Sequence, residues 1–257
     1  MGKTTIRRAI TIKTPEQIAL MRQAGRIVAL ALSEARRAAR PGATTAHLDR
    51  VAEAVIRDHG AVPSFKGYHG YPATLCTSVN DEIVHGIPSP SRVLRAGDLV
   101  KIDCGAIYAG WQGDAAITVG VGPISQTASR LIAATEEALS VGVDATRQGG
   151  VVGDIGEAIE DYALGNGYEV VREYCGHGIG RDLHEEPAIH NYRAEGSNVT
   201  LRPGMALCIE PMLNVGGAET EAQSDGWTVK TADGKLSAHF EHTVAVTNNG
   251  PLILTLP

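Results

Sequence analysis

Residues 103–114 read D-C-G-A-I-Y-A-G-W-Q-G-D and connect two segments that have the pattern of β-strands. In residues 99–106, the apolar Val100, Ile102 and Cys104 alternate with Lys101 and Asp103, which is the period of two that a strand requires. Residues 114–120 form the second expected strand, and the glycines of residues 108–113 suit a hairpin loop. The pattern predicts an antiparallel hairpin.

Such a hairpin would place Asp103 and Asp114 side by side near its open face. Two carboxylates at close range raise each other's pKa unless a cation lies between them. A bridging divalent metal ion is the natural cation. Two solvated turn residues are the alternative, and the pair alone does not exclude that interpretation.

The composition limits the class of protein. With 257 residues, 43% of them hydrophobic and no apolar run long enough to span a membrane, the chain suits one globular domain or two small ones. A net charge of -6 argues against sequence-independent binding of nucleic acid. Residues 1–8 lack the apolar region of a secretory signal, and the four cysteines form no C-x-x-C pair. We therefore expect a cytoplasmic protein with free thiols and no membrane anchor.

Capping signals and apolar spacing predict four helices. Thr14, Pro15 and Gln17 are typical of a helix start, and this helix is expected to end at Pro41-Gly42. Three further helices are expected over about 44–59, 125–141 and 153–164. Strands are expected near 73–79, 83–87, 168–174, 207–211, 239–246 and 252–256, with a tight glycine-rich passage at 175–180.

The order of these elements repeats along the chain. Residues 94–103 align with residues 201–210 at a shift of 107 positions, so that Asp103 falls on Glu210. With about twenty further residues inserted, Asp114 falls on Glu241. Two similar halves that face each other, roughly residues 14–120 and 121–257, would gather all four carboxylates where they meet.

Four converging carboxylates need positive charge, which two divalent cations would supply. Hard oxygen ligands suit Mn, Fe, Co or Zn, and the ions of a two-metal site lie about 3.5–4 Å apart. His177 is the natural fifth ligand, because Gly176 and Gly178 let the backbone approach closely and leave the imidazole unobstructed. A Gly-His-Gly by itself is more often a tight turn, but beside four carboxylates we prefer the metal ligand.

Five motifs, taken together, resemble the bacterial type I methionine aminopeptidases. They are C-G-H-G-I-G-R at 175–181, H-E-E-P at 184–187, the Asp103/Asp114 pair, I-E-P at 209–211 and E-H-T at 241–243. The resemblance runs from about Thr14 onward. It implies an α/β (α+β) pita-bread fold, in which two αβ halves related by a pseudo-twofold axis surround a dinuclear metal site. It also implies a single catalytic domain over residues 1–257.

The resemblance implies a role for each metal-binding residue. Asp114 and Glu241 would bridge two metal ions, Asp103 would bind one of them, and His177 and Glu210 would bind the other. Glu210 and Glu241 are 31 positions apart, whereas type II relatives carry a long helical insert there. The implied reaction is removal of the N-terminal methionine from nascent proteins and peptides, with a small second residue preferred.

The resemblance also implies the groups that handle the substrate. Glu210 would shuttle the proton, and His85 and His184 would contact the scissile amide and the developing oxyanion. The implied methionine pocket consists of Tyr68, Tyr71, Cys76 and Trp227. Leu183 stands where many relatives have Phe, and Phe65 where many bacterial members have Cys, so the shape of the pocket is left open.

His85 and His184 look like a symmetric pair. Each begins a His-x-x-Pro and lies nine residues after a cysteine, at a shift of 99 positions, whereas that shift places His177 on Ser78. We therefore predict that His177 binds metal and that His85 and His184 lie beside the metals without binding them. Ordinary core or loop histidines are the alternative.

Other functions stay open on the sequence alone. An Xaa-Pro peptidase of the same fold and a metal-free binding module of that fold are the main alternatives, and a globular protein with scattered surface acids is the simplest. The expected partners are nascent polypeptide N-termini, without nucleic acid or membrane, and the expected state is a monomer. Contact with the ribosome and the identity of the cellular metal are undecided.

Overall fold

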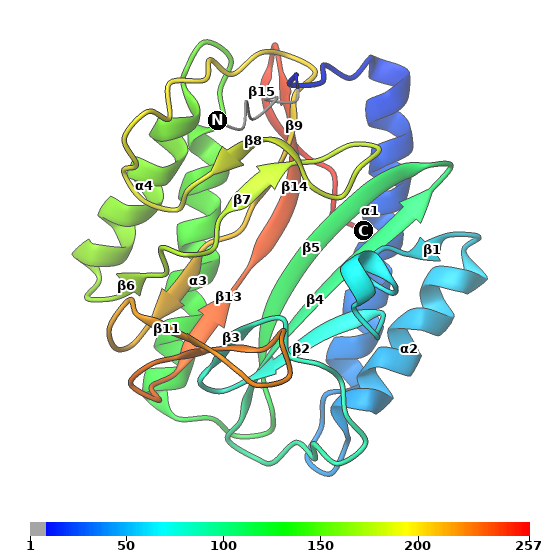
Figure 1. Cartoon of the computed structure of the whole chain (residues 1–257), viewed down its shortest axis with the longest axis vertical. Coiled ribbons are helices and arrows are strands. Elements are labelled where there is room, and N and C mark those ends of the chain that lie inside the picture. The colour runs from blue at the N-terminus through cyan, green and yellow to red at the C-terminus, as the bar shows by residue number, and fades with distance from the viewer. Residues whose placement is uncertain (1–8) are drawn as a thin grey trace, which may run out of the picture.

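A computed structural model describes residues 9–257. The prediction that the chain lacks a secretory signal rests on residues 1–8, which lie outside the described residues. Four helices flank a curled set of strands, two on each side (Figure 1). They are α1 (Pro15–Ala38) and α2 (Thr45–Asp58) on one flank, and α3 (Gln126–Ala145) and α4 (Val152–Gly165) on the other.

Nine strands form the main sheet, in the order β1-β4-β5-β14-β9-β7-β8, with β15 on β14 and β2 on β4. Two three-stranded sheets, β13-β10-β6 and β11-β12-β3, complete the described strands. The bounds are β1 Val62–Pro63, β2 Leu75–Val79, β3 Glu82–Val84, β4 Leu99–Tyr108, β5 Trp111–Gly120, β6 Glu169–Val170, β7 Gly176–Gly178, β8 Glu185–Ile189, β9 Ala206–Ile209, β10 Met212–Asn214, β11 Thr220–Ala222, β12 Val229–Thr231, β13 Ser237–His239, β14 Glu241–Thr247 and β15 Gly250–Ile253.

The predicted hairpin is present as β4 and β5, but its loop is shorter than expected. Tyr108 pairs with Trp111, so the turn consists of Ala109 and Gly110, with φ of 50° and 76°. Two positive φ values in succession are the pattern of a type I′ turn, which matches the twist of the flanking strands. Gly113 therefore lies within β5, where a Cβ would meet the backbone of α1 at 2.6 Å. Gly113 therefore allows α1 to approach the sheet closely. From the sequence alone, this glycine is expected to be part of the loop.

The four predicted helices are present, and the side chains of Thr14, Thr44 and Ser125 cap the first three. The side chain of Thr14 accepts a hydrogen bond from Gln17 N, while the Gln17 side chain accepts one from Thr14 N. This reciprocal pair satisfies donors that the first turn leaves free. One face of α1 and α2 packs on β4 and β5 through a buried apolar cluster, and α3 and α4 cover β9 and β14 through a second one.

Several strand predictions were wrong or incomplete. Residues 168–174 hold only the two-residue strand β6, and the passage 175–180 contains a strand, β7, in the main sheet. Its glycines are needed for packing, because a Cβ on Gly176 would lie 2.2 Å from the carbonyl oxygen of Cys208. The expected strand 207–211 corresponds to β9, which ends at Ile209, before Pro211, a residue that has no N–H to donate. Strand β8 was not predicted at all.

Hydrogen bonds recur at the shift of 107 found in the sequence. Helix α2 becomes α4 at this shift, and the isolated bridge Thr44–Val93 becomes Val151–Thr200. Gly42 N donates to Leu94 O at 2.9 Å, and the shifted pair, Gly149 N and Leu201 O, lies at 3.0 Å. These matches support the interpretation of two related halves, which we retain as a proposal. Among residues 9–257, no helix is both long and apolar enough to cross a membrane.

Candidate active site

The register of the central strands brings the four carboxylates together. Asp103 lies opposite Ala116, and Asp114 lies opposite Gly105, so the two aspartates are diagonal neighbours on one face of the hairpin. Strand β14 pairs with β5 and places Glu241 opposite Ala116 as well. Glu210 directly follows β9, whose Ile209 pairs with His242. Residues from both halves of the chain therefore meet on one face of the sheet.

A cavity of about 260 Å³ lies over this face. All eleven residues that the sequence singled out for metal, catalysis or substrate contact lie in its lining, together with Phe65, His69 and Leu183. The eleven are Tyr68, Tyr71, Cys76, His85, Asp103, Asp114, His177, His184, Glu210, Trp227 and Glu241. Their proximity is thus established by the fold, while their individual roles stay predictions.

Burial dominates the electrostatics of the carboxylates. It raises the pKa of Asp103 to about 7. Burial first, and neighbouring carboxylates second, raise the pKa of Asp114, Glu210 and Glu241 as well. Among the described residues, Oδ1 of Asp103, Oδ1 of Asp114 and Oε1 of Glu241 are buried without a hydrogen-bond partner. Such groups require either protons or a cation, so the site fits divalent metal ions.

One group of donors is compact enough to surround a single ion. Ligand atoms of Asp114, His177, Cys208 and Glu241 all lie within 4.8 Å of one another. Cys208 was not predicted from the sequence as a site residue. Its position two residues before Glu210 places it on the same face of the chain, which was the available signal.

His177 is oriented as a neutral metal ligand would be. Its Nδ1 donates to the carbonyl of Gly178 at 2.9 Å, which leaves the lone pair on Nε2. Nε2 lies 3.6 Å from Oε1 of Glu210. Burial, and then the nearby His184, lowers the pKa of His177 to about 3, so the ring is neutral near pH 7.

His184 lies beside His177. Its Nδ1 lies 2.7 Å from the hydroxyl oxygen of Tyr68, and its ring centroid lies 4.3 Å from that of His177. His85 also lines the cavity, with φ of 61° and its ring centroid 5.6 Å from that of Tyr174. Of the described residues, the compact donor group contains His177 but neither of the other two histidines.

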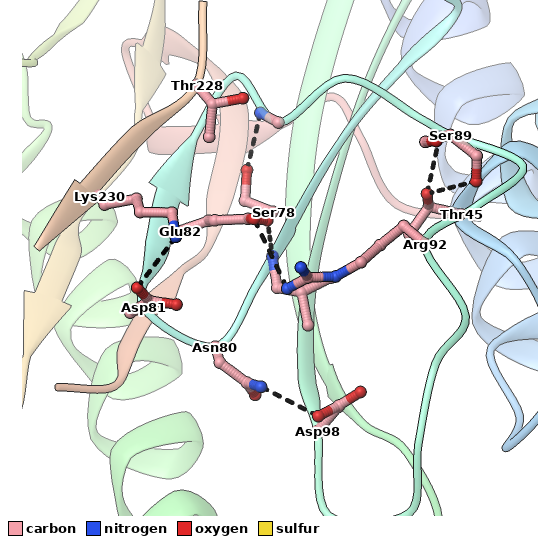
Figure 2. A network of polar contacts seen from close by, with 12 residues as sticks. Thr45, Ser78, Asn80, Asp81, Glu82, Ser89, Arg92, Asp98, Thr228 and Lys230 are labelled. Atoms are coloured by element: carbon pink, nitrogen blue, oxygen red, sulfur yellow. Dashed lines mark hydrogen bonds and ion pairs between the residues drawn. The ribbon is translucent and has the colours of Figure 1, made fainter. Parts of the chain in front are cut away.

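A polar network holds the segment that carries His85. Gly86 N donates to Ser78 Oγ at 3.0 Å, and the side-chain amide of Asn80 donates to Asp98 at 2.9 Å. Ser78, Asn80 and Asp98 are labelled in Figure 2, which shows polar contacts around the turn between β2 and β3. Arg92 and Glu82 add an ion pair at 3.5 Å. The network fixes the backbone on both sides of the histidine.

The expected methionine pocket forms one apolar group. Phe65, Tyr71, Cys76 and Leu183 are buried together, with Tyr68 and Trp227 packed against them. The Tyr71 ring meets the Trp227 ring edge-on at 5.0 Å, and its hydroxyl donates to the carbonyl of Leu75 at 2.9 Å. His69, with φ of 47°, joins the lining and was missed by sequence reasoning.

Comparisons with known proteins agree with this geometry. Metallopeptidase family M24 matches residues 19–248. The methionine aminopeptidase of Clostridium acetobutylicum is 51% identical over 247 residues, covering 96% of this chain and 99% of that protein. The crystal structure of methionine aminopeptidase from Thermotoga maritima has a TM-score of 0.95 at 42% identity and covers 97% of this chain and 100% of that chain.

A second group of relatives is more distant. The prolidase from Pyrococcus furiosus has a TM-score of 0.77 at 25% identity, and the match covers 96% of this chain but only 65% of the prolidase. The predicted pita-bread fold is confirmed by these neighbours, and the methionine aminopeptidases match better in identity, superposition and length. With a family match over most of its length and a buried cluster of metal-capable side chains, the chain belongs to metallopeptidase family M24 and, within it, to the methionine aminopeptidases of bacterial type I.

Proposed function

We propose that this enzyme removes the N-terminal methionine from peptides and nascent proteins at a centre of two divalent metal ions, and that it prefers a small second residue. The observation that carries the proposal is the convergence of two buried carboxylates, Asp114 and Glu241, two half-buried ones, Asp103 and Glu210, and His177 in a cavity with an apolar pocket. Two divalent ions balance four carboxylates in charge. Co, Mn, Fe and Zn all suit the donor set.

Each ligand has a proposed place. Asp114 and Glu241, which lie on neighbouring central strands, would be shared by both ions. Asp103 would bind only one of the two ions, and His177 and Glu210 would bind only the other. The bound ions would polarise the scissile carbonyl and lower the pKa of the attacking water. The unpartnered oxygens of Asp103, Asp114 and Glu241 support this assignment.

The remaining chemistry belongs to side chains of the cavity wall. Glu210 would accept the proton of the attacking water and pass it to the leaving amine. His184 has Nδ1 against Tyr68 Oη, which fixes its ring, and Nε2 would donate a hydrogen bond to the carbonyl oxygen as negative charge develops there. His85 would donate a hydrogen bond to the scissile amide.

Specificity for methionine would come from the apolar group around Tyr71 and Trp227. A flexible thioether fills an irregular apolar slot well and makes favourable contacts with aromatic rings. The cavity of about 260 Å³ leaves little room beyond the scissile bond, which favours a small second residue. The proposal also retains the single catalytic domain with two related halves, a monomeric state and a cytoplasmic location, with nascent chain N-termini as partners. Ribosome contact stays open.

A peptide assay tests this function. The metal-free protein is reconstituted with Mn²⁺, Co²⁺, Fe²⁺ or Zn²⁺ singly and then offered Met-Gly-, Lys-Gly- and Xaa-Pro-initiated peptides. We expect release of free methionine from the Met-Gly peptide alone, and a Glu241→Gln protein that binds less metal and is inactive. Equal rates on the three peptides, or full activity and metal content in Glu241→Gln, would refute the proposal.

A further inference from the structure

A buried histidine behind Glu210 has no part in the mechanism described above. His239, the last residue of β13, is 1% exposed. Within the described part of the chain, its Nε2 is buried and has no hydrogen-bond partner. Nε2 lies 3.8 Å from Oε2 of Glu210. An unpartnered polar atom at such depth costs free energy, so its orientation toward the carboxylate calls for a function.

The backbone of His239 is held from both sides by one side chain. Oγ1 of Thr118, in β5, accepts a hydrogen bond from His239 N at 2.9 Å and donates one to His239 O at 2.7 Å. The residue also pairs with Met212 of β10. Because both backbone groups are tied to neighbouring strands, the imidazole has little freedom to move away from Glu210.

The two oxygens of Glu210 face two different histidines. Oε1 lies 3.6 Å from Nε2 of His177, and Oε2 lies 3.8 Å from Nε2 of His239. His177 already donates its one proton from Nδ1 to Gly178, so its Nε2 offers a lone pair. The Nε2 of His239 is buried without a hydrogen-bond partner in the described part of the chain, and a proton on this atom faces Oε2 of Glu210. Of these two imidazoles, only that of His239 can donate to the carboxylate.

We propose that His239 is a positioning residue that donates its Nε2–H to Oε2 of Glu210 and thereby keeps Oε1 turned toward His177. The gap of 3.8 Å is about 1 Å longer than a charge-assisted hydrogen bond, so the proposed bond requires the two side chains to approach by that distance. Partners of this kind behind metal ligands typically contribute 10–100-fold to metal affinity or activity. The inference rests on the proposed role of Glu210 as ligand and proton shuttle.

Three substitutions separate hydrogen bonding from shape. His239→Gln keeps an N–H at the reach of Nε2, His239→Asn carries its amide on a shorter side chain, and His239→Leu has none. His242→Leu is the matched control. Its residue lies one position beyond Glu241, its Nδ1 lies 2.8 Å from Thr255 Oγ1, and it lines a separate cavity between α1 and α3.

Each protein is stripped of metal, and its affinity for Mn²⁺ is measured by calorimetric titration. The values of kcat and KM are then measured with a Met-Gly peptide. The Tm of each variant shows whether it is folded. We expect His239→Leu and His239→Asn to lose 10–100-fold in Mn²⁺ affinity or kcat with little change in KM. His239→Gln and His242→Leu should stay within about threefold of wild type, since both keep a donor behind Glu210.

Several results would overturn the inference. One is a folded His239→Leu protein with the Mn²⁺ affinity and kcat of the wild type. Another is an equal loss of Mn²⁺ affinity or kcat in the Gln and Asn variants. The third is loss of a whole equivalent of Mn²⁺ in His239→Gln, which would make His239 a ligand. If the Leu variant does not fold, the Gln and Asn pair decides. Mn²⁺ affinity is read without turnover, so a wild type that releases no methionine refutes the proposed function and leaves this test intact.

Discussion

At the scale of single residues, burial and charge determine which form each side chain can take. The carboxylates of the cavity have raised pKa values because burial disfavours their charged form, and the histidines around them have lowered values for the same reason. Metal ions remove the first penalty, and a neutral His177 is already in the form that binds them. Residues that touch metal should therefore differ sharply from residues that touch substrate.

The contrast between His177 and His184 tests this difference. We expect His177→Ala to lose metal, because its Nε2 is directed toward the carboxylates. His184→Ala should keep its metal and lose about 10²–10³ in kcat, the usual cost of one donor to a developing oxyanion. Metal content and kcat are measured for both variants at saturating metal, with His85→Ala as a third case that should resemble His184→Ala. Equal metal loss in the His177 and His184 variants would show that these roles are assigned wrongly.

At the scale of elements, the long helix α1 packs closely on the β4–β5 hairpin and on the segment around Leu254. At the points of closest approach there is no space for a side chain. A Cβ on Gly25 would lie 2.3 Å from the carbonyl oxygen of Leu254, and one on Gly113 would meet the backbone of Gly25 itself at 2.6 Å. Two glycines thus set how closely the helix covers the sheet. The ligands on β4 and β5 depend on this packing for their positions.

Gly25→Ala should therefore destabilise the protein. Overpacking of this kind typically costs about 1–3 kcal/mol in the free energy of unfolding. Gly165→Ala is the control, since Gly165 is also helical, has no heavy atom within 4 Å of a built Cβ, and should gain roughly 0.4–1 kcal/mol. Urea unfolding of both variants measures the difference. A Gly25→Ala protein as stable as the Gly165→Ala protein would contradict the packing described.

A buried lysine joins strands of the two halves. Lys101 of β4 is 1% exposed, and its Nζ donates to Asn80 O at 2.7 Å and to Ser237 O at 3.1 Å. Burial lowers its pKa from 10.5 to about 7. The unfolded chain therefore binds more protons than the folded protein above pH 7, and this residue makes stability rise with pH there.

Replacing Lys101 with Met should abolish that contribution. We expect the wild type to gain stability relative to Lys101→Met as the pH rises from 7 to 9. Urea unfolding of the metal-loaded proteins at pH 7, 8 and 9 measures the difference, and the background of other titrating groups cancels between the two. Parallel stability curves would mean that folding does not lower the pKa of Lys101, so that the lysine stays charged in the folded protein from pH 7 to 9.

At the scale of the whole molecule, the proposed metal site lies where the two proposed halves of the chain meet. Asp103 and Asp114 come from the first half, and His177, Glu210 and Glu241 come from the second. Their carboxylates repel one another unless protons or cations lie between them. The stability of the whole fold is therefore linked to both pH and metal.

Removal of metal should destabilise the protein more at high pH than at low pH. In the metal-free protein the raised carboxylate pKa values mean that the folded state binds more protons than the unfolded state. Its stability is then greatest below the ordinary carboxylate range and falls as the pH rises through the value of about 7 for Asp103. Bound metal replaces the protons and, at 100 times Kd, adds roughly 2.7 kcal/mol per site.

Calorimetric Tm values at pH 5 and pH 8, with metal and after chelation, measure this effect. The gap in Tm between loaded and stripped protein should be wider at pH 8. A gap that does not change with pH would indicate that the carboxylates do not control the stability of the metal-free fold.

The sequence by itself determined the parts of this protein that depend on local order. Capping residues start α1, the period of two marks the β4–β5 hairpin, and the shift of 107 relates Asp103 to Glu210. These signals work because they involve residues that are close along the chain or that repeat at a constant distance. The four carboxylates and His177 could be gathered into one site for that reason, whereas Tyr68, Tyr71, Cys76 and Trp227 were singled out only by the family resemblance.

Only the tertiary structure decided where unmarked residues lie. The tight passage around His177 is a strand because the neighbouring β8 pairs with it on one side and β9, from further along the chain, on the other. Cys208 and His239 carry no motif, and they reach the site through strand pairing and through contacts of Thr118 with β13. The physical reason is that burial and pairing partners are properties of the folded sheet, so spacing along the chain does not by itself identify the side chains whose role depends on them.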